Sequence, residues 1–131
     1  MEKSENLIQS EILIEVNKRG HRLWRTNAGK VTTKDNRIVK LMPKGYPDLT
    51  GFRKSDGKFI VIEVKNAKGR LRPEQIKFKE FIEKQPVIYG VARNAEEAIK
   101  IIEEWLSETD WTTYWYGRYS KNKSVNVCAS N

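Results

Sequence analysis

The chain has 131 residues, which is a usual length for one compact domain and too short for two. Its 25 lysines and arginines against 17 aspartates and glutamates give a net charge of +8. This excess favours a polyanionic partner such as nucleic acid, although lysines that only keep a protein soluble would give the same total. A hydrophobic content of 38% excludes a disordered chain.

The sequence carries no sign of export or of a membrane segment. Cys128 is the only cysteine, so the chain has neither a disulfide framework nor a Cys/His zinc spacing, and a reducing compartment fits. The N-terminal segment is charged in every turn, and no 18 consecutive residues are apolar. We therefore expect a protein that is not secreted and does not contact a membrane.

The first expected element is an amphipathic helix over residues 4–18. Ser4 is suited to its N-cap and Gly20 to its end. The apolar residues of its core face repeat every four positions: Ile8, Ile12 and Val16, with Leu13 beside them. Residues 21–26 then alternate polar and apolar side chains, as a half-buried strand does.

The middle of the chain predicts a hairpin and two further strands. Residues 31–42 form either a hairpin or a long loop that turns at Asp35 and Asn36. Residues 44–52 contain a proline bend that leads into a short strand. Residues 58–65 are the best strand, and its apolar residues on both faces predict a central place in the sheet.

The last elements expected are a helix, a strand and a helix. The first helix begins at Pro73 and covers residues 73–84, the strand covers 86–92, and the second helix covers 95–106 with Asn94 as its cap. Helices that alternate with strands predict an α/β sheet covered on both faces, with a parallel crossover through the first of these helices.

The expected domain therefore spans residues 1–106. Residues 107–131 are rich in tryptophan and tyrosine but too irregular to assign. Aromatic side chains of this kind either pack on the domain or on a second subunit, or stack on unpaired bases.

Ionic side chains stand at the end of the strand over 58–65. Side chains of a strand alternate between its faces, so Glu63 and Lys65 continue the face of Phe59 and Val61. A carboxylate and an ammonium on an apolar face are costly to bury unless they pair with each other, with a metal or with another charge. Taken alone, this motif favours a simple ion pair of Glu63 with Lys65.

A second carboxylate shifts the balance towards a metal site. Asp48 stands at the proline bend ahead of the neighbouring strand, so it can meet Glu63 at one end of the sheet. Two carboxylates suit magnesium or manganese, and the backbone carbonyl of Val64 is a further oxygen ligand. Such a metal would polarise a phosphate and activate water, while Lys65 could orient that water or offset negative charge. These are the parts of phosphodiester hydrolysis.

Pro47-Asp48 followed by Glu63-Val64-Lys65 resembles the signature of the PD-(D/E)XK superfamily, which has the restriction-endonuclease-like fold. More narrowly, the sequence resembles the stand-alone VRR-NUC domains of phages and bacteria. The further segments that carry this resemblance are residues 24–29, 45–48, 69–75 and 87–106. It covers roughly residues 4–106, and several motifs in the correct order are more specific than any one alone.

The resemblance implies a core of the order αβββαβ with a mixed central sheet, Mg²⁺ or Mn²⁺ as cofactor, and a homodimer that cuts branched DNA such as Holliday (four-way) junctions. It also implies a cytoplasmic protein of a bacterial or phage-infected cell. By motif match, Asp48 and Glu63 are metal ligands, Lys65 is the catalytic lysine and Gln75 is an active-site residue. Without the resemblance, Gln75 would be interpreted as a solvated residue in the first turn of a helix.

Related folds also place an acidic residue of the first helix in the site. Gln9 stands where we would expect this glutamate, and a neutral side chain there weakens the case for a second metal. Glu5, one turn earlier, could reach the same site, although the helix dipole explains a first-turn glutamate equally well.

Basic residues near the expected site are candidates for phosphate contact, with solvated loop charges as the alternative. They are Lys68, Arg70 and Arg72 in the loop after Lys65, and Arg25, Lys30 and Lys44 on segments expected at the same end of the sheet. His21, the only histidine, has no partner at a motif spacing, and we expect it to be structural.

The sequence thus predicts a Mg²⁺- or Mn²⁺-dependent endodeoxyribonuclease that acts on branched DNA. Two alternatives stay open at this point. One is a DNA-binding module that keeps the fold without cutting, and the other is a nuclease that acts on linear duplex.

Overall fold

A sheet with helices on both faces forms the body of the protein, which we describe from a computed structural model covering residues 2–26 and 30–106. The elements in chain order are α1 (Glu5–Lys18), β1 (Arg22–Arg25), β2 (Lys30–Thr32), β3 (Ile38–Lys40), β4 (Leu49–Phe52), β5 (Phe59–Val64), α2 (Pro73–Ile82), β6 (Ile88–Ala92) and α3 (Ala95–Glu104). Without the β2–β3 hairpin, the order through β6 is αβββαβ, which confirms the predicted fold class.

The sheet has the order β1-β4-β5-β6. β4 runs antiparallel to β1 and to β5, while β5 and β6 are parallel and are joined through α2. β5 therefore lies inside the sheet, as predicted. Because of these strand directions, the C-terminal ends of β1, β5 and β6 lie at the same end of the sheet as the N-terminal end of β4. We call this the Asp48 end of the sheet, and it includes Arg25, Asp48, Val64 and Ala92.

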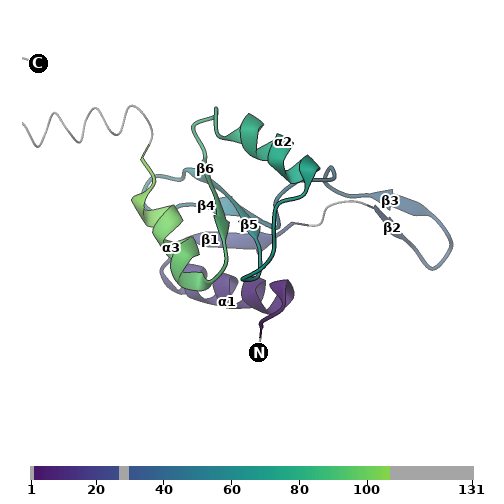
Figure 1. Cartoon of the computed structure of the whole chain (residues 1–131), viewed down its shortest axis with the longest axis horizontal. Helices are drawn as coiled ribbons and strands as arrows, with labels where there is room; N and C mark the ends of the chain where they lie inside the picture. The colour runs from purple at the N-terminus through teal and green to yellow at the C-terminus, as the bar shows by residue number, and fades with distance from the viewer. Residues whose placement is uncertain (1, 27–29, 107–131) are drawn as a thin grey trace, which may run out of the picture.

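The two faces of the sheet are covered by different helices. Figure 1 shows α1 and α3 on one side of the sheet and α2 on the other. The larger core lies under α1 and α3, and its fully buried members are Ile12, Val16, Leu49, Ile60, Ile62, Val64, Ile88, Ala92, Ala98 and Ile102. The opposite face of β5, beneath α2, carries Val61 and Glu63.

Local sequence signals account for several helix boundaries. The Ser4 side chain accepts a hydrogen bond from the Leu7 N–H at 3.2 Å, and the Asn94 side chain accepts one from Glu97 at 2.8 Å. Gly20 has a φ of 98°, a conformation that glycine adopts without strain just after a helix.

Three predicted elements extend two residues too far at one end. The strand expected from residue 86 begins at Ile88, because Pro86 has no N–H to donate to the ladder. The helix expected to residue 106 ends at Glu104, since Trp105 is extended. The helix expected to residue 84 ends at Ile82, with Glu83 as its C-cap.

The segment between β1 and β4 forms a hairpin outside the main sheet. β2 and β3 pair antiparallel with each other, and the turn between them contains Asn36 at a φ of 62°. The hairpin stands away from the body of the molecule (Figure 1). This confirms the hairpin alternative for residues 31–42, with shorter strands than expected.

Among the described helices, none is both long and apolar enough to cross a membrane. The aromatic segment over residues 107–131 lies outside the described residues.

Candidate active site

Asp48 is held in place by both neighbouring strands. Its backbone carbonyl accepts a hydrogen bond from the Thr26 N–H at 2.8 Å, and the Thr26 hydroxyl donates to the Pro47 carbonyl. Its carboxylate Oδ2 accepts a hydrogen bond from the Val64 N–H at 2.9 Å. The Asp48 carboxylate thus accepts the hydrogen bond that a backbone carbonyl of a neighbouring strand would otherwise accept from β5. This bond fixes the Asp48 side chain at the end of the sheet.

The residues before Asp48 are fixed by contacts with α2. Gly45 has a φ of 91°, and a Cβ added there would lie 2.7 Å from the Glu74 carbonyl oxygen, so only glycine fits. The ring of Tyr46 packs edge-to-face on Phe78, with the ring centroids 5.3 Å apart. The approach to Asp48 is therefore built on the first turns of α2.

Glu63 and Gln75 form a buried contact between β5 and α2. The two residues are only 2% and 5% exposed, and the Gln75 Nε2 donates to a Glu63 carboxylate oxygen at 3.0 Å. The Gln75 side-chain oxygen accepts from the Arg72 N–H at 2.8 Å, so the same amide also caps α2. The interpretation of Gln75 as a solvated surface residue is wrong.

The two carboxyl groups lie close enough to affect each other strongly. The pKa of Glu63 is raised to about 9, first by burial and then by the hydrogen bond and negative charge of Asp48, while the positive charges of Lys65 and Arg72 oppose this shift. Because two neighbouring carboxylates repel each other when both are ionised, a bound cation would stabilise the ionised form of this pair.

Lys65 extends the same face of β5 and is 6% exposed. Among the ion pairs of the described residues, none joins Lys65 to Glu63, and the simple ion pair favoured by the motif alone is not formed. Both polar side chains are instead held under α2 and the loop that follows β5.

The donor set fits a hard divalent cation. Magnesium is bound by one or two carboxylates and keeps several waters, which is what Asp48 and Glu63 can offer. In an extended strand the N–H and C=O of one residue point to the same side, so the Val64 carbonyl lies on the side where its N–H meets Asp48. Within residues 2–26 and 30–106, no three carboxylate, imidazole or thiol groups converge on a metal position.

The two first-helix candidates lie in different surroundings. The amide oxygen of Gln9 accepts a hydrogen bond from Arg25 at 2.5 Å. Glu5 reaches the loop after Lys65, since a Cβ added at Gly69 would lie 3.1 Å from a Glu5 carboxylate oxygen and 3.2 Å from the Lys65 Cδ. Glu5 is thus the candidate that approaches the lysine, without completing a three-carboxylate group with Asp48 and Glu63.

Arg93 is a residue of the site that the sequence interpretation missed. One of its terminal nitrogens, Nη1, donates to the carbonyls of Asn66 at 2.5 Å and of Gly69 at 2.8 Å. Its neighbour Ala92 accepts a hydrogen bond from the Lys65 N–H, so Arg93 follows β6 beside the end of β5. The segment resembling the family includes Arg93, but no spacing rule connects an arginine to these two carbonyls.

The basic residues predicted to contact phosphates are distributed over the Asp48 end of the sheet. Arg25 is exposed and bound to the Gln9 and Ser10 side chains of α1. The exposed basic residues of the surrounding loops are Lys44, Lys68, Arg70 and Arg72. The side chain of Lys30 lies outside the described atoms. These contacts stay predictions.

His21 lies at the other end of β1 and is 5% exposed. Its Nδ1 accepts from the Lys54 N–H at 3.0 Å, and its Nε2 lies 3.0 Å from the Glu103 carboxylate. Its role is structural, as expected.

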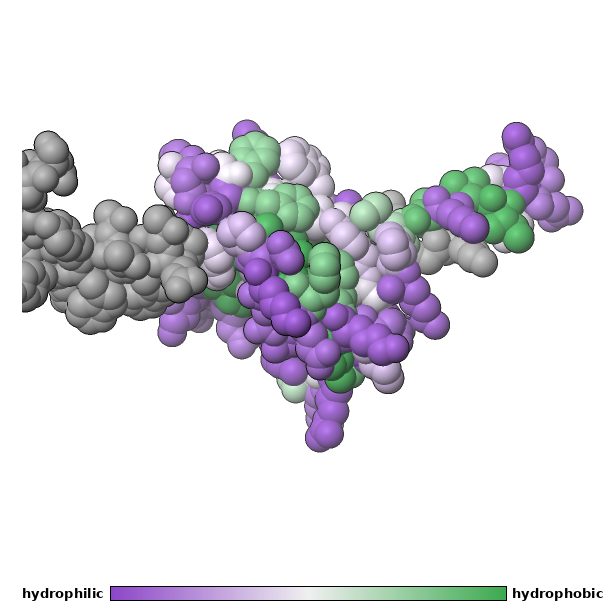
Figure 2. Space-filling model, turned by 90° about the horizontal axis from the view of Figure 1, so that it is seen from above, coloured by the Kyte–Doolittle hydropathy of each residue, from purple (hydrophilic) through white to green (hydrophobic). Residues whose placement is uncertain are grey.

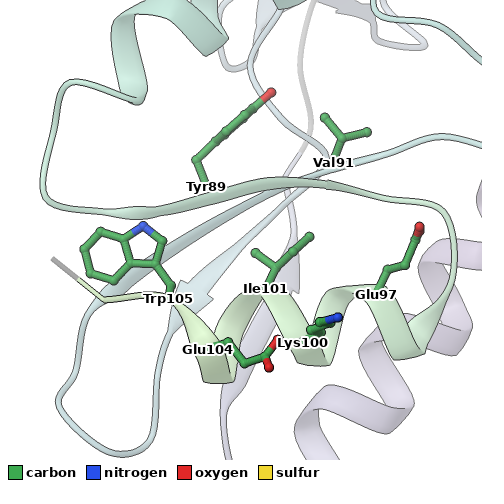
Figure 3. A pocket seen from close by; sticks show the side chains of 7 residues that line it. All are labelled: Tyr89, Val91, Glu97, Lys100, Ile101, Glu104 and Trp105. Atoms are coloured by element: carbon green, nitrogen blue, oxygen red, sulfur yellow. The ribbon is translucent and has the colours of Figure 1, made fainter. Parts of the chain in front are cut away.

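A separate hollow of about 480 Å³ lies between β6 and α3. Tyr89 and Val91 border it from the strand, Ile101 borders it from the helix, and Trp105 borders it from the position just after the helix (Figure 3). Glu97, Lys100 and Glu104 complete its lining, and neither Asp48 nor Glu63 is among the residues that border it.

Comparison with known families matches this arrangement of motifs. The sequence model of the VRR-NUC domain family matches residues 3–96, which include Asp48, Glu63, Lys65 and Gln75. The chain belongs to the VRR-NUC domain family. Membership of this family supports a nuclease-type function with DNA as the substrate.

A solved structure described as a VRR_NUC domain has the same fold as this VRR-NUC chain. The TM-score is 0.55 at 19% identity, over 78% of this chain and 97% of the other. At this identity the likeness shows the fold alone. No curated protein matches the chain significantly.

Proposed function

We propose that this VRR-NUC domain is a Mg²⁺- or Mn²⁺-dependent endodeoxyribonuclease that hydrolyses phosphodiester bonds of branched DNA, with four-way junctions as the preferred substrate. The observation that carries the proposal is the pair of neighbouring carboxyl groups of Asp48 and Glu63, with Gln75 and Lys65 beside them. A buried carboxyl group next to a second, half-buried one is costly for folding alone, which favours a functional role.

Asp48, Glu63 and the Val64 carbonyl would hold the metal. When bound, it would polarise a phosphate oxygen and lower the pKa of a water molecule so that the water becomes a nucleophile at neutral pH. The Val64 N–H holds the Oδ2 of Asp48 and so orients the carboxylate, and Oδ1 would be the oxygen offered to a cation.

The remaining side chains have separate roles. Gln75 fixes the rotamer of Glu63 through its hydrogen bond of 3.0 Å. Lys65 supplies a positive charge on the same face, where it can orient the attacking water or offset charge on the phosphate as the bond breaks. Lys68, Arg70 and Arg72 follow directly in the chain and would contact neighbouring phosphates.

The substrate and assembly proposed here rest on family resemblance and charge. A homodimer would present two equivalent sites to a symmetric junction and could cut two strands. The net charge of +8 favours binding of a polyanion through counterion release. We place this activity in the cytoplasm of a bacterial or phage-infected cell.

The test is cleavage of an end-labelled four-way junction and a matched linear duplex, with Mg²⁺ and with EDTA. Paired nicks near the branch point that require metal are expected for the native protein. Glu63→Ala should abolish cleavage but still bind the junction, while Glu80→Ala, on the exposed side of α2, should cleave normally.

Other outcomes assign the alternatives. Cleavage of the linear duplex alone would keep the nuclease and contradict the junction specificity. Binding without metal-dependent cleavage by the native protein would favour the non-catalytic DNA-binding module.

A further inference from the structure

The β2–β3 hairpin projects from the same end of the sheet as the candidate active site. It is inserted between β1, which ends there, and β4, which begins there. Thr26, before the hairpin, donates hydrogen bonds to the Pro47 and Asp48 carbonyls after it. The hairpin is therefore rooted next to the Asp48 carboxylate, and we call residues 30–40 the arm.

The arm exposes charged and apolar side chains together. Its sequence holds four basic residues and one acidic residue, Asp35, which is already paired with Arg37 at 2.7 Å. Lys34, Arg37 and Lys40 are exposed. Figure 2 shows hydrophobic and hydrophilic atoms side by side on the arm where it stands away from the body.

The apolar side chains of the arm are only partly covered by the described part of the chain. Val31, Ile38 and Val39 are 48%, 67% and 40% exposed. Three β-branched apolar residues in water on one short hairpin are unfavourable, and they point to a partner that covers them.

The shape of the arm fits a groove of duplex DNA. A two-stranded antiparallel ribbon can enter the major groove, which is about 12 Å wide. At about 3.3 Å per residue, the five steps from Lys30 to Asp35 extend roughly 17 Å, which is comparable with the width of the duplex. The apolar side chains could contact thymine methyl groups and sugars while the basic ones contact phosphates.

Charge and composition favour DNA over a second copy of the chain. An arm-to-arm contact across a two-fold axis would place one basic surface against an identical basic surface. Residues 30–40 contain no phenylalanine, tyrosine or tryptophan, the aromatic residues that are enriched at protein interfaces.

We propose that the arm is a DNA-binding element that lies in a groove of the duplex flanking the cleaved phosphate, with its basic residues on the phosphates and its apolar residues on the groove wall. The proposal rests on the proposed nuclease function. It adds a substrate-contacting surface, Lys34, Arg37 and Lys40, that the active-site motif does not contain.

The test is the salt dependence of binding to a 30-base-pair duplex in EDTA, measured by fluorescence anisotropy on the full chain. The arm variant carries Lys34→Gln, Arg37→Gln and Lys40→Gln. The control variant carries Lys18→Gln, Lys84→Gln and Lys100→Gln, which removes the same charge from exposed positions outside the arm.

The arm variant should bind at least about tenfold more weakly near 0.1 M salt, and its slope of log K against log salt should be shallower by about 2 to 3, since each phosphate contact contributes about 0.9. The control should change the slope by less than 1. Circular dichroism and thermal melting check that both variants fold. Equal losses in the two variants would overturn the proposal, because only net charge would then matter.

A second variant tests the alternative that a second copy of the chain, and not DNA, covers the arm. Ile38→Ser with Val39→Ser should weaken DNA binding and leave the mass in solution unchanged. If this variant instead converts a dimer into a monomer with unchanged DNA affinity per chain, the arm is an interface between copies and the proposal is wrong. Absence of cleavage by the native protein would contradict the nuclease function. The anisotropy experiment tests DNA binding by the arm independently of cleavage, because it is carried out in EDTA.

Discussion

At the scale of single residues, Glu63 shows a conflict between folding and the proposed chemistry. Its carboxyl is 2% exposed and lies next to Asp48 and Gln75. Its pKa is raised to about 9, chiefly by burial and then by Asp48, so the metal-free protein holds it protonated at neutral pH. A folded-state pKa above the unfolded value makes a carboxyl contribute stability at low pH that is lost as the pH rises through the folded pKa.

Glu63→Gln should therefore stabilise the metal-free protein. An amide stays neutral and can still donate to Asp48, so we expect the free energy of unfolding at pH 8 in EDTA to rise by about 1 to 3 kcal/mol. Between pH 5 and pH 9 the native protein should lose stability as the pH rises, and the variant should lose less. Urea unfolding across this pH range measures both, and an identical pH dependence in the two proteins would contradict the account.

Arg93 supports the loop that follows Lys65 by its two hydrogen bonds to the Asn66 and Gly69 carbonyls. Arg93→Ala should leave both carbonyls without this donor, and hydrogen exchange of residues 66–72 should become faster by about tenfold. Because both bonds come from a single nitrogen, Arg93→Lys should restore part of the protection. Arg22→Ala, on the exposed side of β1, is the control, and unchanged exchange in Arg93→Ala would show that the loop is held by other contacts.

At the scale of elements, the close pairing of β1 with β4 positions Asp48. Gly51 faces the backbone of β1, and a Cβ there would lie 1.7 Å from the Arg22 carbonyl oxygen. Two strands that approach this closely tolerate no side chain between them.

Gly51→Ala should force β1 and β4 apart and cost about 3 kcal/mol of stability or more. Thr50→Ala, one residue earlier on the same strand, should cost less than about 1 kcal/mol. Thermal melting of both variants makes the comparison. A Gly51→Ala protein as stable as Thr50→Ala would show that the contact is looser than the structure indicates.

Most elements could be predicted from periodicity and caps, since these depend on near neighbours. Ser4 and Asn94 mark helix starts, and the alternation along β5 separates Glu63 from the core face. The hydrogen bonds of Thr26 and Arg93 could not be predicted in this way. Their acceptors are backbone carbonyls, which every residue carries, and only the folded chain brings them together.

At the scale of the whole molecule, paired cleavage of a junction requires an assembly of two chains. The described part of each chain holds one pair of Asp48 and Glu63, and two nicks across a junction require two pairs. We expect sedimentation equilibrium to give a mass near twice 15.3 kDa at the concentrations where junctions are cut. Paired, simultaneous nicks by a protein that sediments as a monomer would contradict this expectation.

The central claim is that Asp48 and Glu63 form a divalent metal site, and calorimetric titration with Mn²⁺ tests it most directly. The native protein and Glu80→Gln should bind Mn²⁺, whereas Asp48→Asn and Glu63→Gln should lose binding while remaining folded. Mn²⁺ binding that is equally tight in all four proteins would place the metal elsewhere and contradict the proposed active site.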